Sequence, residues 1–219
     1  MKPIEHSKSL VEKVYDNLLE AICRGELLPG ERLHHDELAE RLGVSRQPIN
    51  SALAILKSQQ LIEDTGKRSV QVSKLDVSLQ LQILEIREWL EPFAIRLTTE
   101  RASKNDLSAI ERCLEKGEKE LRNLDKYRLV ELDVAFHNSI YSATQNPIIE
   151  KMMSINMHNV RRFMSSVLSG QSAPVAVWNE HRQIFNSIES QDTKTGIELM
   201  KHHISHARDR LLKSQNENN

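Results

Sequence analysis

Apolar residues recur every three or four positions along most of the chain, and this period predicts a protein built mainly of α-helices. The first predicted helix ends at Gly25, because glycine readily takes the left-handed backbone that closes a helix. A short second helix is predicted over residues 36–42 and a third over residues 46–58, with Ser45 as its N-cap. The apolar stripe of the first helix consists of Val11, Val14, Leu18 and Ile22.

After residue 58 the apolar positions change from a helical period to a period of two. Residues 61–63 and 70–72 alternate as β-strands do, and the polar loop between them contains Gly66. Three helices followed by a small hairpin predict a winged helix-turn-helix domain, which we place at residues 1–74. Over residues 75–219 the helical period returns, with about six helices and no strand signal. The chain is therefore predicted to be mainly α, with a second, all-helical domain.

The third predicted helix has a polar face suited to the major groove of DNA. Arg46 can bond guanine, while Gln47 and Asn50 can bond adenine. The segment from Gly43 to Lys74 carries five basic and two acidic residues and is locally +3, although the whole chain has a net charge of −1. The alternative is an ordinary helical hairpin with a solvated basic edge. The predicted contacts to double-stranded operator DNA are Ser45, Arg46, Gln47, Asn50, Lys57, Lys67 and Arg68.

The composition of the chain indicates its cellular compartment. No apolar run approaches the roughly 20 residues of a membrane span, and the start of the chain lacks the apolar core of a secretory signal. Cys23 and Cys113 are the only cysteines, so no disulfide framework is indicated. We therefore expect a cytoplasmic protein with no membrane partner.

Two stretches carry a family resemblance. The segment Gly25-Glu-Leu-Leu-Pro-Gly-Glu-Arg-Leu33 and the segment from Glu37 to Pro48 (ELAERLGVSRQP) resemble the DNA-binding domain of the GntR family of bacterial transcription regulators, over about residues 9–74. Asn50 stands where an arginine is common in that family, and the loop Gly66-Lys-Arg-Ser69 replaces a frequent Gly-Arg-Gly. The resemblance implies the winged helix-turn-helix fold, but the departures mean that the usual operator of the family is not assumed.

The helical domain has polar residues that are predicted to face its interior. Asp133 and His137 are one turn apart on the flank of one apolar face, and His181 falls near the middle of another. His203 lies on the same side of the last helix as the apolar Met200. One carboxylate and three imidazoles suit Zn or Ni, with Mn and Fe as further candidates. The alternatives are hydrogen-bonded core histidines and a surface Asp/His pair.

A second resemblance supports this interpretation. Five motifs carry it, namely Ile86–Glu91, Asp133–His137, Asn146-Pro147, Glu180-His181-Arg182 and Met200–Ile204. They are similar to the FCD effector domain of the FadR branch of the GntR family, over about residues 78–213. The resemblance implies an antiparallel bundle of six or seven helices, which holds a divalent metal through one Asp and three His and binds a carboxylate metabolite beside it. Matched residue by residue, the ligands would be Asp133, His137, His181 and His203.

Two polar residues are candidates for effector binding. Arg87 is predicted to lie on the flank of an inward face, where it could clamp a carboxylate through two hydrogen bonds. Its alternative partner is Glu91, one turn later. Asn156 is predicted to be a buried polar group, which either lines the pocket or makes a structural hydrogen bond. The inward face near Arg87 is predicted to consist of Ile83, Ile86, Leu90 and Ala94.

Together these features favour a homodimeric, ligand-responsive transcription regulator, specifically a repressor that binds operator DNA and a small carboxylate. Two-fold symmetry would place two recognition helices in successive major grooves. A competing hypothesis is a metal-dependent hydrolase or lyase, although no nucleophile motif or phosphate loop is found. A third is a DNA-binding protein whose helical domain only dimerises.

Overall fold

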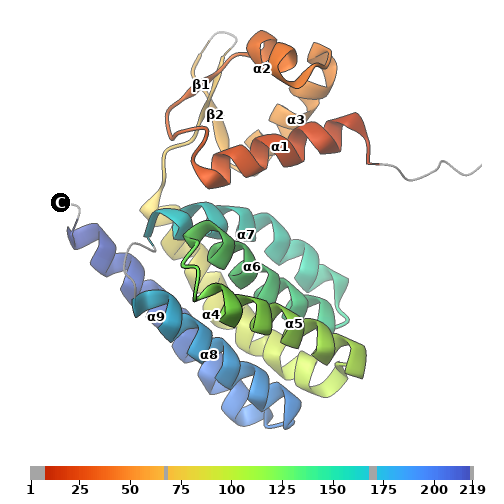
Figure 1. The fold of residues 1–219 in the computed structure, drawn as a ribbon, viewed down its shortest axis with the longest axis vertical. Coiled ribbons are helices and arrows are strands. Elements are labelled where there is room, and N and C mark those ends of the chain that lie inside the picture. Colours follow the sequence, from red (N-terminus) through yellow and green to blue (C-terminus); the bar gives the residue numbers. More distant parts are fainter. Residues whose placement is uncertain (1–7, 67–68, 168–171, 218–219) are drawn as a thin grey trace, which may run out of the picture. The chain divides into compact units, whose positions relative to one another are not determined.

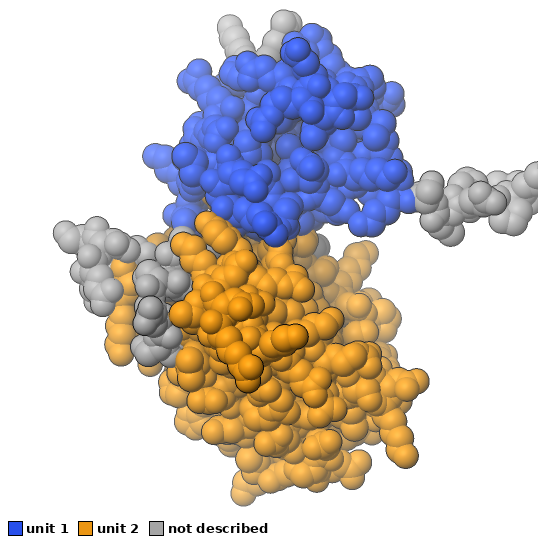
Figure 2. All heavy atoms as spheres, viewed as in Figure 1, with its two compact units in different colours: residues 1–75 blue, residues 76–219 orange. Residues whose placement is uncertain are grey.

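The computed structural model describes residues 8–66, 69–167 and 172–217. The chain folds into two compact units, residues 1–75 and 76–219, which are coloured separately in Figure 2. The division falls one residue beyond the boundary expected from the sequence. Each unit has its own elements and core, so each is described by itself.

The first unit contains helices and a small sheet (Figure 1). Ser9 accepts a hydrogen bond from the Glu12 amide while the Glu12 side chain accepts from the Ser9 amide, and this capping box fixes the start of α1. Gly25 closes α1 with a φ of 71°, as the sequence predicted. The elements are α1 (Leu10–Arg24), β1 (Arg32–Leu33), α2 (His35–Leu42), α3 (Arg46–Ser58), β2 (Ile62–Asp64) and β3 (Val70–Val72).

The sheet contains a strand that the sequence analysis missed. β3 pairs antiparallel with β2, as the predicted hairpin requires, and on its other edge with β1, giving the order β1-β3-β2. Only Arg32 and Leu33 form β1, opposite Gln71 and Val70. Two residues are too few to show a period of two, so β1 left no signal in the pattern of apolar positions.

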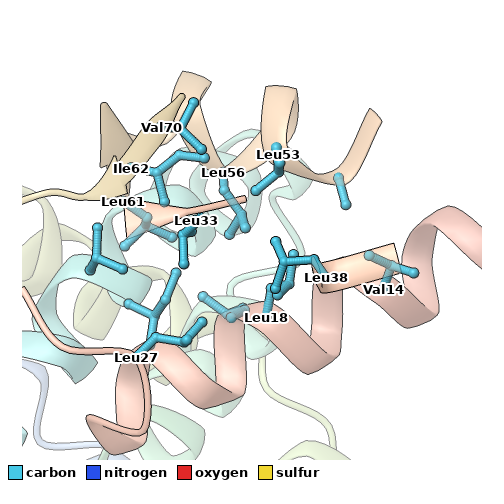
Figure 3. Close-up of a cluster of buried hydrophobic side chains, with 14 of the residues drawn as sticks. Val14, Leu18, Leu27, Leu33, Leu38, Leu53, Leu56, Leu61, Ile62 and Val70 are labelled. Carbon is cyan, nitrogen blue, oxygen red and sulfur yellow. The ribbon is translucent and has the colours of Figure 1, made fainter. Parts of the chain in front are cut away.

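The core of the first unit joins the sheet to all three helices (Figure 3). α1 packs against α3, and the apolar face predicted for α3, which includes Ile49, Leu53 and Leu56, is buried. Leu61 and Ile62, where β2 begins, complete this core. Because one face of α3 is committed to the core, its opposite face is left on the surface.

The second unit is a helical bundle. α4 packs along α9, α5 along α6, and α8 along α9 (Figure 1). None of the helices in the described ranges is long and apolar enough to cross a membrane. The predicted class, mainly α with an N-terminal winged helix-turn-helix and a C-terminal helical bundle, is confirmed. The helices are α4 (Val77–Arg101), α5 (Lys104–Glu120), α6 (Lys126–Ala143), α7 (Pro147–Val167), α8 (Ser172–Glu189) and α9 (Thr193–Glu217).

The inward face of α4 differs from the predicted one. Ile86 is 54% exposed, whereas Arg87 and Glu91 are buried, so the helix is rotated relative to the expectation. The two buried side chains form an ion pair one turn apart. Because the pairing allows two charged residues to be buried, an inward face assigned from apolar residues alone is misplaced.

A glycine allows α5 to approach α8. A Cβ built on Gly117 would lie 2.0 Å from the ring of Trp178, far inside van der Waals contact. The Trp178 ring in turn meets His181 edge-on, with ring centres 4.9 Å apart. The close contact of these helices therefore helps to set the position of His181.

Candidate metal centre and DNA-reading helix

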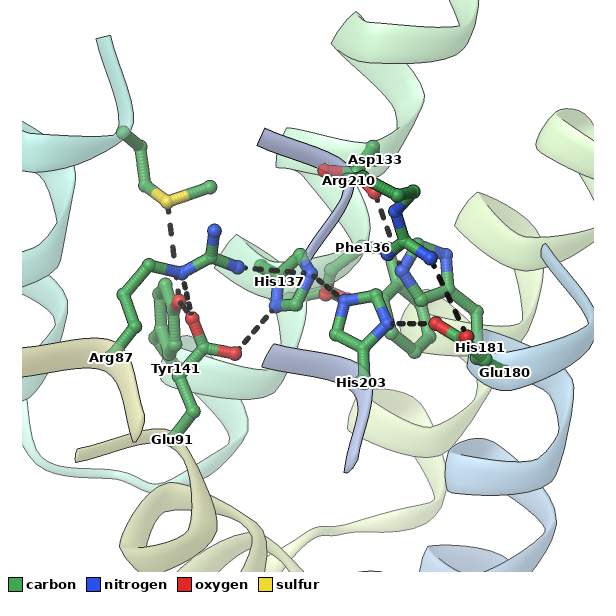
Figure 4. A network of polar contacts seen from close by, with 12 residues as sticks. Arg87, Glu91, Asp133, Phe136, His137, Tyr141, Glu180, His181, His203 and Arg210 are labelled. Carbon is green, nitrogen blue, oxygen red and sulfur yellow. Dashed lines mark hydrogen bonds and ion pairs between the residues drawn. The ribbon is translucent and has the colours of Figure 1, made fainter. Parts of the chain in front are cut away.

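Three histidines from three helices meet inside the bundle (Figure 4). His137 comes from α6, His181 from α8 and His203 from α9. All are buried, with at most 3% of each exposed, and one nitrogen of each lies within 4.8 Å of the others. We call these residues the histidine cluster. Asp133, one turn before His137, is also buried and lies beside the cluster.

The spacing within the histidine cluster is that of ligands around one ion. The ring centres of His137, His181 and His203 are 5.4, 5.2 and 4.8 Å apart. Two imidazoles bound to one ion at about 2.1 Å have nitrogens roughly 3.0–3.4 Å apart and ring centres about 5 Å apart. Nε2 of His137 lies 3.3 Å from Nε2 of His203, and Nε2 of His181 lies 3.3 Å from Oδ1 of Asp133. Both pairs have the separation expected of neighbouring ligands.

Hydrogen-bond partners show which ring nitrogens carry lone pairs. Nδ1 of His203 lies 2.7 Å from Oε2 of Glu180. Burial would raise the pKa of Glu180, but His203 and His206 lower it to about 2, so this ionised carboxylate accepts a hydrogen bond from Nδ1–H of His203. The lone pair of neutral His203 is then on Nε2. Arg87 has only donors, so His137 Nε2, 3.3 Å from Nη2 of Arg87, is also an acceptor.

The Nε2 atoms of His137 and His203 lie 3.3 Å apart. A cation between them would take the lone pair of His203 and could replace Arg87 as the partner of His137 Nε2. His181 would gain a partner as well, since neither of its ring nitrogens has a hydrogen-bond partner and Oδ1 of Asp133 has none either. Burial and the nearby His203 and His137 hold the pKa of His181 well below its usual value, so its ring is neutral. Buried polar atoms without partners are costly. The donor set fits a divalent ion such as zinc, and the histidine cluster could hold one.

A second polar group lies beside the cluster. Glu91 accepts hydrogen bonds from Nε of Arg87 and, over 2.7 Å, from the hydroxyl of Tyr141. Its other oxygen lies 2.9 Å from Nδ1 of His137, without the alignment of a hydrogen bond. Burial would raise the pKa of Glu91, but Arg87 and His137 hold it well below its usual range. Burial together with Glu91 raises the pKa of Tyr141 well above its usual value.

The two predicted effector residues differ in their surroundings. Arg87 makes the ion pair with Glu91 that was one of its two expected roles, and its Nη2 also points at the histidine cluster. Asn156 is only half-buried, which corrects the expectation of a buried amide. Its Nδ2 donates to the carbonyl of Met152, one turn earlier on α7, over 3.0 Å. This local hydrogen bond satisfies the amide without a deeper partner.

The predicted DNA-reading residues lie on the exposed face of α3. Arg46, Gln47, Asn50 and Lys57 are all exposed. Arg46 forms an ion pair with Asp36, and Lys57 forms one with Asp64. Exposed ion pairs contribute at most about 1 kcal/mol, so these cations can exchange partners for phosphate or base.

The start of α3 is also open. Ser45 occupies the predicted N-cap position but makes no side-chain capping hydrogen bond, so its hydroxyl is not used by the helix. A serine at a helix start can donate to a DNA phosphate. The predicted contacts Lys67 and Arg68 lie outside the described residues.

Sequence reasoning did not assign the acidic residues that orient the histidines. Glu180 directly precedes His181, and Glu91 follows Arg87 by one turn, so both belong to the motifs noted above. Carboxylates behind metal-binding histidines are the common arrangement. Both acidic residues are part of those motifs. They were not predicted as partners of the histidines, because an acidic residue on a charged helix is usually exposed to solvent.

Comparison with known proteins defines the class. A winged helix-turn-helix unit followed by a helical bundle with a buried histidine cluster is the construction of a transcription regulator. Residues 10–72 match the gntR family of bacterial regulatory proteins, and residues 82–206 match the FCD domain. The chain belongs to the GntR family and to its FCD-containing branch. Its relatives are transcription regulators, so the hydrolase or lyase hypothesis is set aside.

Similar proteins cover almost the whole chain. The HTH-type transcriptional regulator YdhC of Bacillus subtilis strain 168 is 25% identical over 194 residues, covering 88% of this chain and 86% of the relative. The galactonate operon transcriptional repressor of Escherichia coli K12 is 26% identical over 203 residues, covering 83% and 87%. The solved structure of E. coli McbR/YncC has a TM-score of 0.84 at 21% identity and covers 95% of this chain and 100% of that one. That likeness supports the fold.

Proposed function

We propose that this protein is a homodimeric repressor whose helical unit binds a divalent metal and a small carboxylate. The observation that carries the proposal is the approach of Nε2 of His137 to Nε2 of His203, over 3.3 Å, beside His181, whose ring nitrogens lack hydrogen-bond partners. The proposed ligands are Asp133, His137, His181 and His203, and the proposed ions are Zn or Ni, with Mn or Fe as further candidates. Once bound, the metal supplies a positive charge that can coordinate an oxygen of the effector.

Arg87 is the proposed second anchor of the effector. Its guanidinium is held by Glu91 and directs Nη2 toward the histidine cluster, so one carboxylate could meet both the metal and Arg87. Asn156 on α7 is retained as a candidate contact, since its side chain is only half-buried. A relative is named for the galactonate operon, and galactonate is a hydroxycarboxylate, which supports this class of effector.

An exposed apolar stripe on α4 is the proposed dimer interface. Trp89 is 85% exposed, and Ile86 and Phe93 lie one turn to either side of it, both exposed. Such a stripe on a surface marks a protein interface. A two-fold axis near Trp89 would pair Ile86 of one subunit with Phe93 of the other, so the stripe is self-complementary.

The dimer gives the proposed mode of DNA binding. Two copies of α3 would enter major grooves about 34 Å apart on a palindromic operator. Metabolite binding in the helical units would change the relative placement of the two DNA-binding units. A coupling of about 1–3 kcal/mol changes operator affinity by roughly 5–150-fold. The relatives include both a repressor and an activator, and the repressor role is part of our proposal.

A combined measurement tests the proposal. Tag-free protein is examined by elemental analysis, then by thermal melting against a panel of small carboxylates with and without added metal. We expect a bound metal and a carboxylate that raises Tm only when metal is present. Selected operator DNA should be released by the same carboxylate in a gel shift.

A matched pair of variants separates the proposal from a domain that only dimerises. His181→Ala should abolish both the metal and the response to carboxylate, while His34→Ala, which changes an exposed histidine of the first unit, should leave both intact. Wild-type protein without metal, or a His181→Ala variant that still responds, contradicts the proposal.

A further inference from the structure

Two more histidines lie on the exposed side of α9, one helical turn apart. His202 and His206 flank His203 in sequence, but both are exposed, whereas His203 belongs to the buried histidine cluster. Their ring centres are 6.3 Å apart, with an angle of 36° between the ring planes. Two histidines at i and i+4 on one helix face form a chelating pair for a transition metal.

The geometry of this pair is close to that of a bound state. Two imidazoles on one ion have ring centres about 5 Å apart, so the rings need to approach by roughly an ångström. Exposed side chains rotate through such distances readily. Glu198, one turn before His202, is exposed and pairs with Lys201 at the surface, over 2.8 Å. It could supply an oxygen as a third ligand at little cost.

Glu180 connects the exposed pair to the buried cluster. Its Oε2 lies 2.7 Å from Nδ1 of His203 (Figure 4). Its Oε1 lies 2.8 Å from Nδ1 of His206. The Glu180 side chain is 20% exposed, between a surface histidine and a histidine that is almost wholly buried. When Nδ1–H of the neutral His206 ring donates its hydrogen bond to Glu180, the lone pair of that ring is on Nε2, where a metal can bind.

We propose that His202 and His206 form a second, exposed site for a divalent transition metal, and that this site delivers the ion to the buried cluster past Glu180. The inference rests on the proposed function of the buried cluster as a metal centre. The exposed site has few ligands and is open to solvent, so it binds weakly and exchanges quickly. The buried site has more ligands, each oriented or enclosed by the protein, and binds tightly.

The test uses tag-free, metal-free, full-length protein titrated with Ni²⁺ against a chromophoric chelator, with the rate of filling followed by stopped flow. Wild-type protein should bind one tight and one weak equivalent per chain. The double variant His202→Gln/His206→Gln should lose the weak equivalent and fill the tight site about tenfold or more slowly, because local capture raises association rates by this order. The affinity of the tight site should not change. His34→Gln, at an exposed histidine of the first unit, is the matched control.

The results distinguish three claims: the exposed site, the delivery of the ion and the buried metal centre. A weak equivalent that persists in the double variant overturns the exposed site, and a tight site that fills at the wild-type rate overturns the delivery of the ion. Failure of the underlying metal centre looks different, since wild-type protein would then lack the tight equivalent while the weak one remained. His181→Ala should reproduce that pattern, with the weak equivalent still removed by the double substitution on α9.

Discussion

The buried ion pair between Arg87 and Glu91 gives a direct test of how the helical unit is stabilised. The two side chains are 3% and 0% exposed, so removing one charge leaves the other without water or a counter-charge. Breaking such a pair from one side costs about 3–5 kcal/mol. We expect Arg87→Leu and Glu91→Leu each to lower the free energy of unfolding by about that amount. For a chain of this size the corresponding fall in Tm is roughly 6–20 °C.

The double variant Arg87→Leu/Glu91→Leu should lose much less unfolding free energy than the sum of the two single losses. It removes both charges, but the Tyr141 hydroxyl loses the acceptor that it now reaches over 2.7 Å. An unsatisfied buried hydroxyl costs about 1–3 kcal/mol, and we expect the double variant to lose about that amount. Independent effects would instead cost roughly 6–10 kcal/mol.

Urea unfolding of chelator-treated protein, followed by tryptophan fluorescence at one protein concentration, measures these values. Trp89 and Trp178 are the only tryptophans and both lie in the helical unit, so the signal reports that unit. The control is Glu118→Gln, which weakens a partly exposed ion pair with Arg182 and should cost at most about 1 kcal/mol. A double variant that loses the sum of the two single losses would refute the reasoning.

Three further predictions concern packing, DNA and assembly. Gly117→Ala should destabilise the helical unit by about 1–3 kcal/mol, because its new methyl overlaps the Trp178 ring, and should weaken metal binding; unchanged melting would contradict the close contact. Arg46→Ala should weaken binding to selected operator DNA by about 1–3 kcal/mol in a gel shift, more than it weakens binding to random DNA; equal losses on both would show a phosphate contact instead. Trp89→Asp should shift the protein toward monomer in analytical ultracentrifugation without loss of helix by circular dichroism, and an unchanged mass would place the dimer interface elsewhere.

The sequence predicts those parts of the fold that repeat locally. The start of α3 and the glycine closures of α1 and α2 follow from side-chain and backbone preferences of single residues such as Gly25 and Gly43. The histidine cluster was also accessible, because His137, His181 and His203 each fall on the inward side of an amphipathic helix. Whether three helix faces meet at one point is a tertiary property, which no single helix contains.

The misplaced face of α4 has a different cause. A count of apolar residues treats every charged residue as solvated, so Ile86 was assigned inward and Arg87 to the flank. In the structure two opposite charges one turn apart neutralise each other inside the bundle, and the apolar Ile86 and Trp89 are left outside. Such a rotation cannot be deduced from α4 alone, because it depends on Tyr141 and His137 from another helix.

The ion pairs on the exposed face of α3 bear on how the protein finds a site among many competing ones. Asp36 and Asp64 present carboxylates to Arg46 and Lys57, the two cations that we propose to contact DNA. On that proposal, any duplex must displace these internal anions before it gains the two cations, so fewer counterions are released on random and operator DNA alike. An operator regains the difference through base contacts that random sequence lacks. If Arg46 and Lys57 make these contacts, the acidic residues weaken both kinds of binding, but a nearly saturated operator loses less of its occupancy than random DNA does.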